Sequence, residues 1–220
     1  MFIKKYSLGA KITYRKGLMS AKMIKFAYKT ELLSFPSMRS SICKWLLTHC
    51  FHLEDCTRNP WPTKCIIVLA PHTSNWDFII GMLFLWSHRQ QANFLMKSEW
   101  FFWPMGILMR YLGGIPVRRS KNTSMTDQLA ARAAEMPVFH LCITPEGTRR
   151  PTTEWKHGFF YIAQKAQIPV VVYALDFKTR RILEGDTFVP SADMKAEDAI
   201  AQMKEFYRGM EGKKPGKFIV

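Results

Sequence analysis

An uninterrupted run of apolar residues at 65–70 (Cys-Ile-Ile-Val-Leu-Ala) constrains the fold of this chain most strongly. Successive side chains of a strand point to opposite faces of the sheet, so apolar residues at every position mean that both faces are covered. Parallel strands inside a sheet have this pattern, and the crossovers that join them are usually helices. The run therefore predicts a buried strand of a parallel sheet covered by helices.

Strands and helices alternate through the residues that follow. We expect further strands at 92–96, 115–118, 138–143 and 170–175, helices at 75–87, 124–135, 154–166 and 196–208, and a turn at 184–186. This alternation predicts an α/β domain with a layered, mostly parallel central sheet flanked by helices. Because Pro60 and Pro62 close the preceding region, we expect this domain to span residues 61–220.

Residues 1–60 form a basic and amphipathic region that we expect to be helical. Residues 1–30 hold eight lysines and arginines and no acidic residue. Met19, Met23 and Phe26 fall on one helical face, and lysines cover much of the rest. We interpret this region as one that docks on an anionic membrane surface.

The chain has neither a secretory signal nor an apolar run long enough to cross a membrane. We therefore expect a cytoplasmic protein that is peripherally associated with the inner face of the cell membrane. The segment 100–117 is the nearest approach to a membrane span, but prolines, glycines and an arginine interrupt it. It is apolar enough to lie at an interface or to line an acyl-chain site.

The formal net charge of +15 points to an anionic partner, which can be lipid head groups, nucleic acid or an acidic carrier protein. The chain has none of the familiar nucleic-acid recognition signatures and no paired zinc motif. We therefore expect no nucleic-acid partner.

The five cysteines are irregularly spaced, and we expect reduced thiols. One cluster contains residue types that bind metals: His49, Cys50, His52, Asp55 and Cys56. It lacks a C-x-x-C pair and a matching second half, so we expect no bound metal. We interpret residues 43–53 instead as the end of an apolar helix with buried thiols.

His72 and Asp77 follow the first strand in an H-x-x-x-x-D pattern. Asp77 can accept the far N–H of the His72 imidazole and fix its tautomer, so that the neutral ring takes a proton from an attacking alcohol. A purely structural interpretation is also open, in which Ser74 and Asp77 form a capping box at a helix start. The two are compatible, because a carboxylate has acceptor sites for both.

A second polar loop, Glu146-Gly147-Thr148-Arg149, follows the strand expected at 138–143. Because parallel strands end at one edge of a sheet, this loop should lie beside His72. Between the two loops, Gly113-Gly114 leads through a short strand to Arg118 and Arg119. Arginine side chains bind phosphate oxygens in a bidentate manner, although paired arginines are often only solvated charge.

Taken in order, these blocks resemble those of the glycerolipid acyltransferases, the family that includes the lysophosphatidic acid acyltransferases. The resemblance covers residues 62–180 and includes Lys97, Ile168-Pro169-Val170 and Lys156-x-Gly158. Departures are Pro71, where many members have asparagine, Thr144, where phenylalanine is usual, and Arg150, where serine follows the arginine.

The resemblance implies a catalytic domain in which His72 is the general base and Asp77 orients it. It implies that Arg119, helped by Arg118 or Lys97, binds an acceptor phosphate. Glu146 would bind a glycerol hydroxyl, and Gly147, Thr148 and Arg149 would belong to the same substrate site. No bound cofactor is expected, because acyl-CoA or acyl carrier protein serves as the acyl donor.

The implied reaction acylates a lysolipid, and 1-acyl-glycerol-3-phosphate, which yields phosphatidic acid, is the first candidate acceptor. Another lysophospholipid or an aminolipid remains open, as does a non-catalytic lipid-binding protein on the same fold. The sequence leaves open the acyl donor, the acyl chain length, the oxyanion stabiliser and the oligomeric state.

Overall fold

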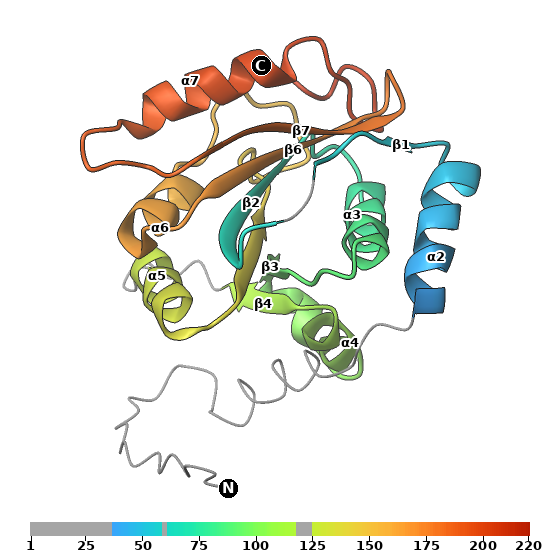
Figure 1. The fold of residues 1–220 in the computed structure, drawn as a ribbon, viewed down its shortest axis with the longest axis horizontal. Coiled ribbons are helices and arrows are strands. Elements are labelled where there is room, and N and C mark those ends of the chain that lie inside the picture. Colours follow the sequence, from blue (N-terminus) through green and yellow to red (C-terminus); the bar gives the residue numbers. More distant parts are fainter. Residues whose placement is uncertain (1–36, 59–60, 118–124) are drawn as a thin grey trace, which may run out of the picture. The chain divides into compact units, whose positions relative to one another are not determined.

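A seven-stranded sheet organises the chain, in the order β1-β7-β6-β2-β5-β3-β4 (Figure 1). It is seen in a computed structural model that describes residues 37–58, 61–117 and 125–220. The strands are β1 (Glu54–Asp55), β2 (Lys64–Ala70), β3 (Asn93–Lys97), β4 (Gly114–Val117), β5 (Phe139–Ile143), β6 (Val170–Asp176) and β7 (Arg181–Phe188). Neighbouring strands are parallel except β6 and β7, so the predicted mostly parallel sheet is confirmed.

The apolar run at 65–70 is the middle strand β2, which pairs with β5 and β6. Ile66 and Val68 pack into the core on one face of the sheet, and Cys65 and Ile67 into the core on the other. All four are buried, which explains why every position of the run is apolar.

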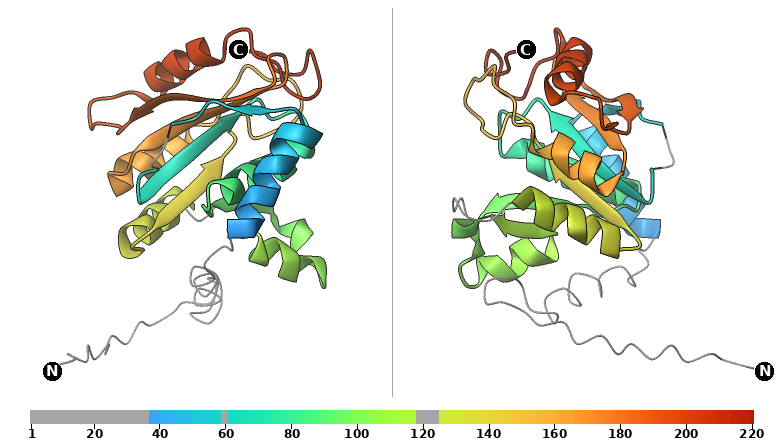
Figure 2. Two further views of the ribbon diagram at one scale, coloured as in Figure 1. Left: turned by 45° about the vertical axis from the view of Figure 1, so that its right-hand side comes forward. Right: turned by 90° about the vertical axis from the view of Figure 1, so that its left-hand side faces the viewer.

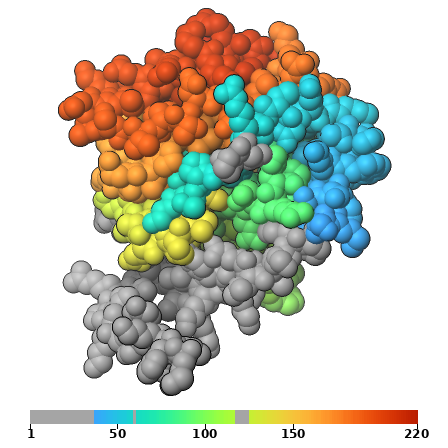
Figure 3. Space-filling model, in the orientation of Figure 1, coloured from blue at the N-terminus to red at the C-terminus, as the bar shows by residue number. Residues whose placement is uncertain are grey.

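Helices cover both faces of the sheet, as predicted (Figure 2). One face packs against α5 (Met125–Glu135), α6 (Gly158–Ala166) and α7 (Ala196–Tyr207). The other packs against α3 (Trp76–Ser87) and η2 (Leu46–Cys50), and α2 (Ser37–Trp45) lies along α3. Two short helices, η3 (Ser98–Phe101) and α4 (Met105–Tyr111), lie between β3 and β4 in the chain. In Figure 3, α7 and the residues after it (red) form one end of the visible surface.

The predicted strands and helices are present in the described residues, with several boundaries shifted by up to four residues, but one predicted turn is wrong, and residues 54–55 of the region predicted to be helical form the strand β1. Helix α6 begins at Gly158, four residues later than the predicted start at 154. The turn predicted at 184–186 is wrong, because these residues lie inside β7. Glycine suits this position because a Cβ would lie only 3.2 Å from the Phe206 ring. The position is also beside an irregularity in the pairing of β6 with β7.

Residues 37–58 belong to the same compact unit as the strands, so this part of the N-terminal region is not separate from the domain. Its helix ends at Cys50 rather than at 53. Cys43 is buried as expected, but Cys50 and Cys56 are exposed. The basic residues 1–36 lie outside the described residues. No helix in the described ranges is long and apolar enough to cross a bilayer.

The parallel strands β2, β3 and β5 all end at one edge of the sheet, and this edge positions the polar loops. The loop with His72 follows β2, Lys97 is the last residue of β3, and the loop with Glu146 follows β5. Three segments that are far apart in sequence therefore meet at one place.

Candidate active site

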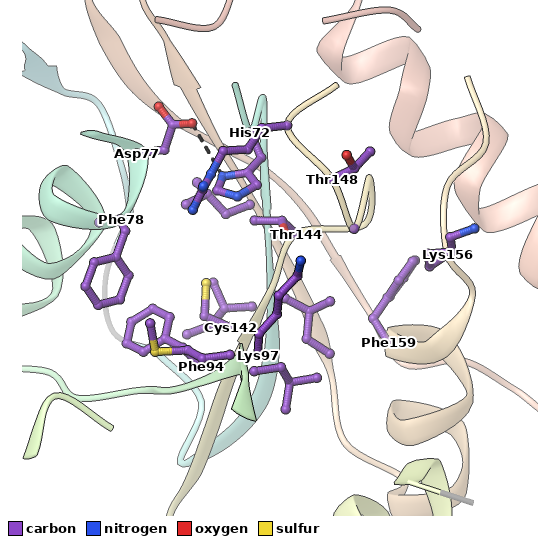
Figure 4. Close-up of a pocket in the computed structure, with 18 of the residues that line it drawn as sticks. His72, Asp77, Phe78, Phe94, Lys97, Cys142, Thr144, Thr148, Lys156 and Phe159 are labelled. Atoms are coloured by element: carbon purple, nitrogen blue, oxygen red, sulfur yellow. Dashed lines mark ion pairs between the residues drawn. The ribbon is translucent and has the colours of Figure 1, made fainter. Parts of the chain in front are cut away.

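His72 and Asp77 face each other at the carboxyl edge of the sheet (Figure 4). His72 lies in the loop after β2, and Asp77 is the second residue of α3. The distance from His72 Nδ1 to Asp77 Oδ2 is 3.4 Å, with 17% of the His72 side chain and 1% of Asp77 exposed. The imidazole thus reaches the pocket while its partner carboxylate is shielded from water.

Asp77 also organises the loop that carries His72. Its Oδ2 accepts the backbone N–H groups of Thr73 and Ser74, each at 2.7 Å. Ser74 Oγ accepts the N–H of Trp76 at 3.2 Å, so part of the expected capping box is present, but the helix N-cap is Asn75 rather than Ser74, and its side chain makes no capping bond. The same carboxylate thus holds the chain before the helix and faces the imidazole, while the catalytic role of the pair stays a prediction.

The second loop reaches the first through Glu146. Its Oε1 accepts the backbone N–H of His72 at 2.7 Å, and the Glu146 side chain is only 3% exposed. Burial raises the pKa of Glu146 from its usual value of 4.5 to about 7, partly opposed by the hydrogen bond from His72. This hydrogen bond therefore ties the backbone of His72 to the second loop.

The Gly147 turn gives the second loop its shape. Gly147 has a φ of +64°, which glycine adopts without strain, and its N–H donates to the Thr144 carbonyl at 3.1 Å. The N–H of Lys156 donates to the Pro145 carbonyl at 2.7 Å. These bonds hold Thr148 and Arg149 on the wall of the pocket.

A pocket of about 1420 Å³ includes His72 and Asp77 in its wall. Basic side chains line the part near the loops: Lys97, Arg149, Arg150 and Lys156. Figure 4 shows Lys97 and Lys156 on different sides of this space. Only two acidic residues, Asp77 and Glu99, line it among the described residues, so this part of the pocket favours an anionic ligand.

The remaining wall is mostly apolar: Met125, Leu129, Phe159 and Ile162 come from α5 and α6, and a larger part lies between α3 and the sheet. Its residues come from α3, β2, β3, β6 and the chain before β2: Ile80, Gly81, Phe84, Leu85, Ile67, Leu69, Phe94, Tyr173, Leu175 and Trp61. The segment 100–117, which the sequence suggested for this purpose, contributes only Trp100 and Met109 among its described residues. The shape of the apolar compartment thus depends on α3 together with α5 and α6.

All the predicted site residues in the described ranges line the pocket except Glu146. His72, Asp77, Lys97, Gly147, Thr148 and Arg149 line the pocket, whereas Glu146 lies behind His72. Arg118 and Arg119 lie outside the described residues. No group of three or more His, Cys, Asp or Glu side chains in the described ranges is arranged to hold a metal ion.

Sequence reasoning missed a support for the His72 loop from the C-terminal residues. Gly212 is buried against Thr73, and a Cβ at Gly212 would lie 2.5 Å from the Thr73 side chain. The N–H of Lys214 donates to Thr73 Oγ1 at 3.2 Å. Tyr207, fully buried, donates from its hydroxyl to the Tyr173 carbonyl at 2.8 Å. Such long-range contacts leave no local motif.

The raised pKa of Glu146 predicts a measurable effect of pH on stability. The folded protein binds this proton more tightly than the unfolded chain, so the associated stabilisation is complete below about pH 4.5 and is lost as the pH rises through about 7. Glu146→Gln keeps an acceptor for the His72 N–H but does not titrate. The Tm of wild type minus that of Glu146→Gln should therefore decrease as the pH is raised from about 5 to about 7.5, a range that covers most of the interval between the unfolded and folded pKa values of Glu146. An unchanged Tm difference across this range would contradict the assignment.

Comparisons with known proteins identify the family and agree with the fold. A sequence model of the acyltransferase family matches residues 52–176. The 1-acyl-sn-glycerol-3-phosphate acyltransferase beta of Homo sapiens is 30% identical over 127 residues, which are 55% of this chain and 44% of the human protein. The chain thus spans less than half the length of that relative.

Among solved structures, the 1-acyl-sn-glycerophosphate (LPA) acyltransferase PlsC of Thermotoga maritima has a similar fold. Its TM-score is 0.59 at 15% sequence identity, and the match covers 84% of this chain and 83% of that one. The family match covers more than half of the chain and contains both polar loops, and the chain therefore belongs to the acyltransferase family.

Proposed function

We propose that this protein is an O-acyltransferase that moves a fatty acyl group from a thioester donor to a hydroxyl of a lysolipid. The observation that carries the proposal is the pairing of His72 with the buried Asp77 beside a pocket that is basic at one end and apolar along α3. A lysolipid has the matching chemistry, with a charged head group next to an acyl chain.

In the proposed reaction His72 acts as the general base. Its Nε2 takes the proton of the acceptor hydroxyl while the hydroxyl oxygen attacks the thioester carbonyl carbon. The C–S bond then breaks, and the departing thiolate takes the proton from the imidazolium. Asp77 orients the ring through Nδ1, and the observed 3.4 Å separation shortens when substrate binds, as catalytic hydrogen bonds often do.

The acceptor that we propose is 1-acyl-glycerol-3-phosphate, which would give phosphatidic acid. The support is the set of basic side chains that line the pocket, together with the activity in the name of the human relative. Arg118 and Arg119 follow directly after β4, whose Val117 pairs with Lys97, and we assign them with Lys97 to the acceptor phosphate. Because Glu146 already accepts the His72 N–H, we propose loop positioning as its role; its contact with a glycerol hydroxyl stays a prediction.

The acyl donor is acyl-CoA or acyl carrier protein, both of which are anionic and suit the net charge of +15. No bound cofactor or metal is required for this chemistry. We further propose that the protein works on the cytoplasmic face of the cell membrane, where the basic residues 1–30 would bind anionic lipids.

The first test removes the proposed base. His72→Ala should lower turnover by about 10²- to 10⁴-fold, because general-base assistance is lost, while the Tm stays close to that of wild type. The assay uses both donors and a panel of phosphorylated and neutral lysolipids. His49→Ala is the matched control, since His49 is exposed and lies outside the pocket wall.

Retention of more than about a tenth of wild-type turnover would remove His72 from this role. Product only with a neutral lysolipid would support the proposed acyl transfer but contradict 1-acyl-glycerol-3-phosphate as the acceptor. No product from wild type with any donor and acceptor would favour a lipid-binding protein on this fold.

A second test disturbs the C-terminal support without touching the pocket. Gly212→Ala places a methyl group within van der Waals overlap of Thr73, so the His72 loop must shift. We expect kcat to fall about ten- to a hundredfold, because small misplacements of catalytic groups have effects of this order. Lys214→Ala keeps the backbone N–H that Thr73 accepts and should leave kcat unchanged. Equal kcat values for Gly212→Ala and wild type would show that the loop does not need this support.

The third test concerns the acyl chain. Gly81 lines the apolar wall on α3, and a Cβ there would lie 3.8 Å from Leu69 Cδ2, so a short extension fits while a longer side chain enters the pocket. Gly81→Leu should therefore lower kcat/KM for long acyl donors, by about tenfold or more for each methylene excluded, and spare short ones. Met82→Leu, on the same helix but outside the pocket wall, is the control. An equal loss for all chain lengths would place the acyl chain elsewhere.

A further inference from the structure

Six large apolar side chains are exposed on one short segment after β3. They form what we call the apolar ridge: Trp100, Phe102, Trp103, Ile107, Leu108 and Tyr111. Trp103 is 83% exposed, and the others are between 47% and 58% exposed. Soluble proteins rarely gather so many large apolar side chains on a single exposed segment without a partner, so the ridge requires an explanation.

The ridge is held rigidly by the residues beneath it. Gly106 and Met109 are the buried residues of α4, whereas Ile107, Leu108 and Tyr111 are exposed. At Gly106 the helix lies so close to η3 that a Cβ would be 2.6 Å from the Phe101 carbonyl oxygen. The Arg110 guanidinium lies 5.3 Å from the centre of the Phe101 ring. The exposed side chains are therefore presented by a packed helix pair rather than by a loose loop.

The ridge continues into the mouth of the proposed active-site pocket. Trp100 belongs both to the ridge and to the pocket wall, and Lys97, at the end of β3, immediately precedes η3. Ile79 on α3 also lines the pocket and is exposed, and so is the neighbouring Trp76. Exposed apolar side chains thus come from two helical segments, η3 and α3, beside the same opening.

We infer that the apolar ridge inserts into the surface of an anionic lipid bilayer and sets the pocket mouth against it. This inference rests on the proposed function, because a lysolipid acceptor resides in a membrane. Tryptophan and tyrosine favour the interface between head groups and acyl chains, where an apolar ring and a polar edge are both satisfied. The charged residues between 93 and 117 are Lys97, Glu99 and Arg110, which leaves a net positive charge next to the ridge.

Two other occupants of the ridge fit these observations less well. Residues 1–30 of the same chain carry eight basic and no acidic residues, so they would bring positive charge to a region that is already positive. A second copy of the chain, with a net charge of +15, would meet the same repulsion. An anionic bilayer complements both the apolar and the basic side chains.

The test measures binding of the full-length protein to vesicles of phosphatidylcholine and phosphatidylglycerol by sedimentation. The double variant Trp103→Ser and Ile107→Ser should bind vesicles at least about tenfold more weakly. The free energy gained by burying either side chain in the bilayer is by itself larger than a tenfold change in affinity represents. The matched control is Tyr161→Ser and Val189→Ser, which removes one exposed aromatic and one exposed aliphatic side chain elsewhere on the surface. The control should bind within about twofold of wild type.

Hydrogen exchange followed by mass spectrometry gives the location. Vesicles should add protection at residues 98–111 of the wild-type protein. Equal vesicle binding by wild type and the ridge variant, or no added protection at 98–111, would overturn the inference. A dimer without vesicles that dissociates in the ridge variant would assign the ridge to self-association and would also overturn it.

The activity assay separates this inference from the proposed function. The ridge variant should keep wild-type turnover with a lysolipid dispersed in detergent and lose turnover with the same lysolipid in vesicles. If neither protein shows activity in detergent, the proposed function fails while the vesicle-binding difference still tests the ridge. Equal turnover of the two proteins on vesicles would contradict insertion of the apolar ridge and would leave the proposed acyl transfer unaffected.

Discussion

The carboxylate of Asp77 is the interaction on which the site depends. Its Oδ2 accepts two loop amides at 2.7 Å and faces the His72 ring at 3.4 Å, while only 1% of the side chain is exposed. A buried carboxylate is costly unless hydrogen bonds compensate it, and here those bonds come from the loop that carries His72. The shape of the loop and the direction of the imidazole are thus consequences of one arrangement.

The sheet supplies the position of this arrangement, and two other parts of the chain hold it in place. Parallel β2 and β5 end side by side, which allows Glu146 to hold the His72 amide from the neighbouring loop. Gly212 and Lys214 hold Thr73 from the C-terminal side, beyond the residues that match the family. The region that matches the family therefore contains His72 and Asp77, whereas part of what positions their loop lies outside it.

The sequence predicted the elements whose signals are local. The apolar run of β2 identified the covered strand, and the spacing of His72 and Asp77 predicted part of the capping box and the pairing of the two side chains. It missed β7, because Gly185 between acidic residues is typical of a turn. The glycine instead makes room for the Phe206 ring, a contact that the local sequence does not indicate. It could not predict the support of Thr73 by Gly212, since that contact joins residues that no periodicity relates. The exposure of Trp103 also depends on how α4 packs, which composition alone does not determine.

The measurement that tests the dyad most directly is the tautomeric state of His72 by nitrogen NMR on protein labelled with ¹⁵N-histidine. The His72 signals among the six histidines are assigned by their loss in His72→Gln. In mildly alkaline buffer, wild type should carry the proton on Nδ1 and leave Nε2 free as the base, and Asp77→Asn should lose this preference. A proton on Nε2 in the wild-type protein, or the same tautomer in both proteins, would contradict the assignment of His72 as a base oriented by Asp77.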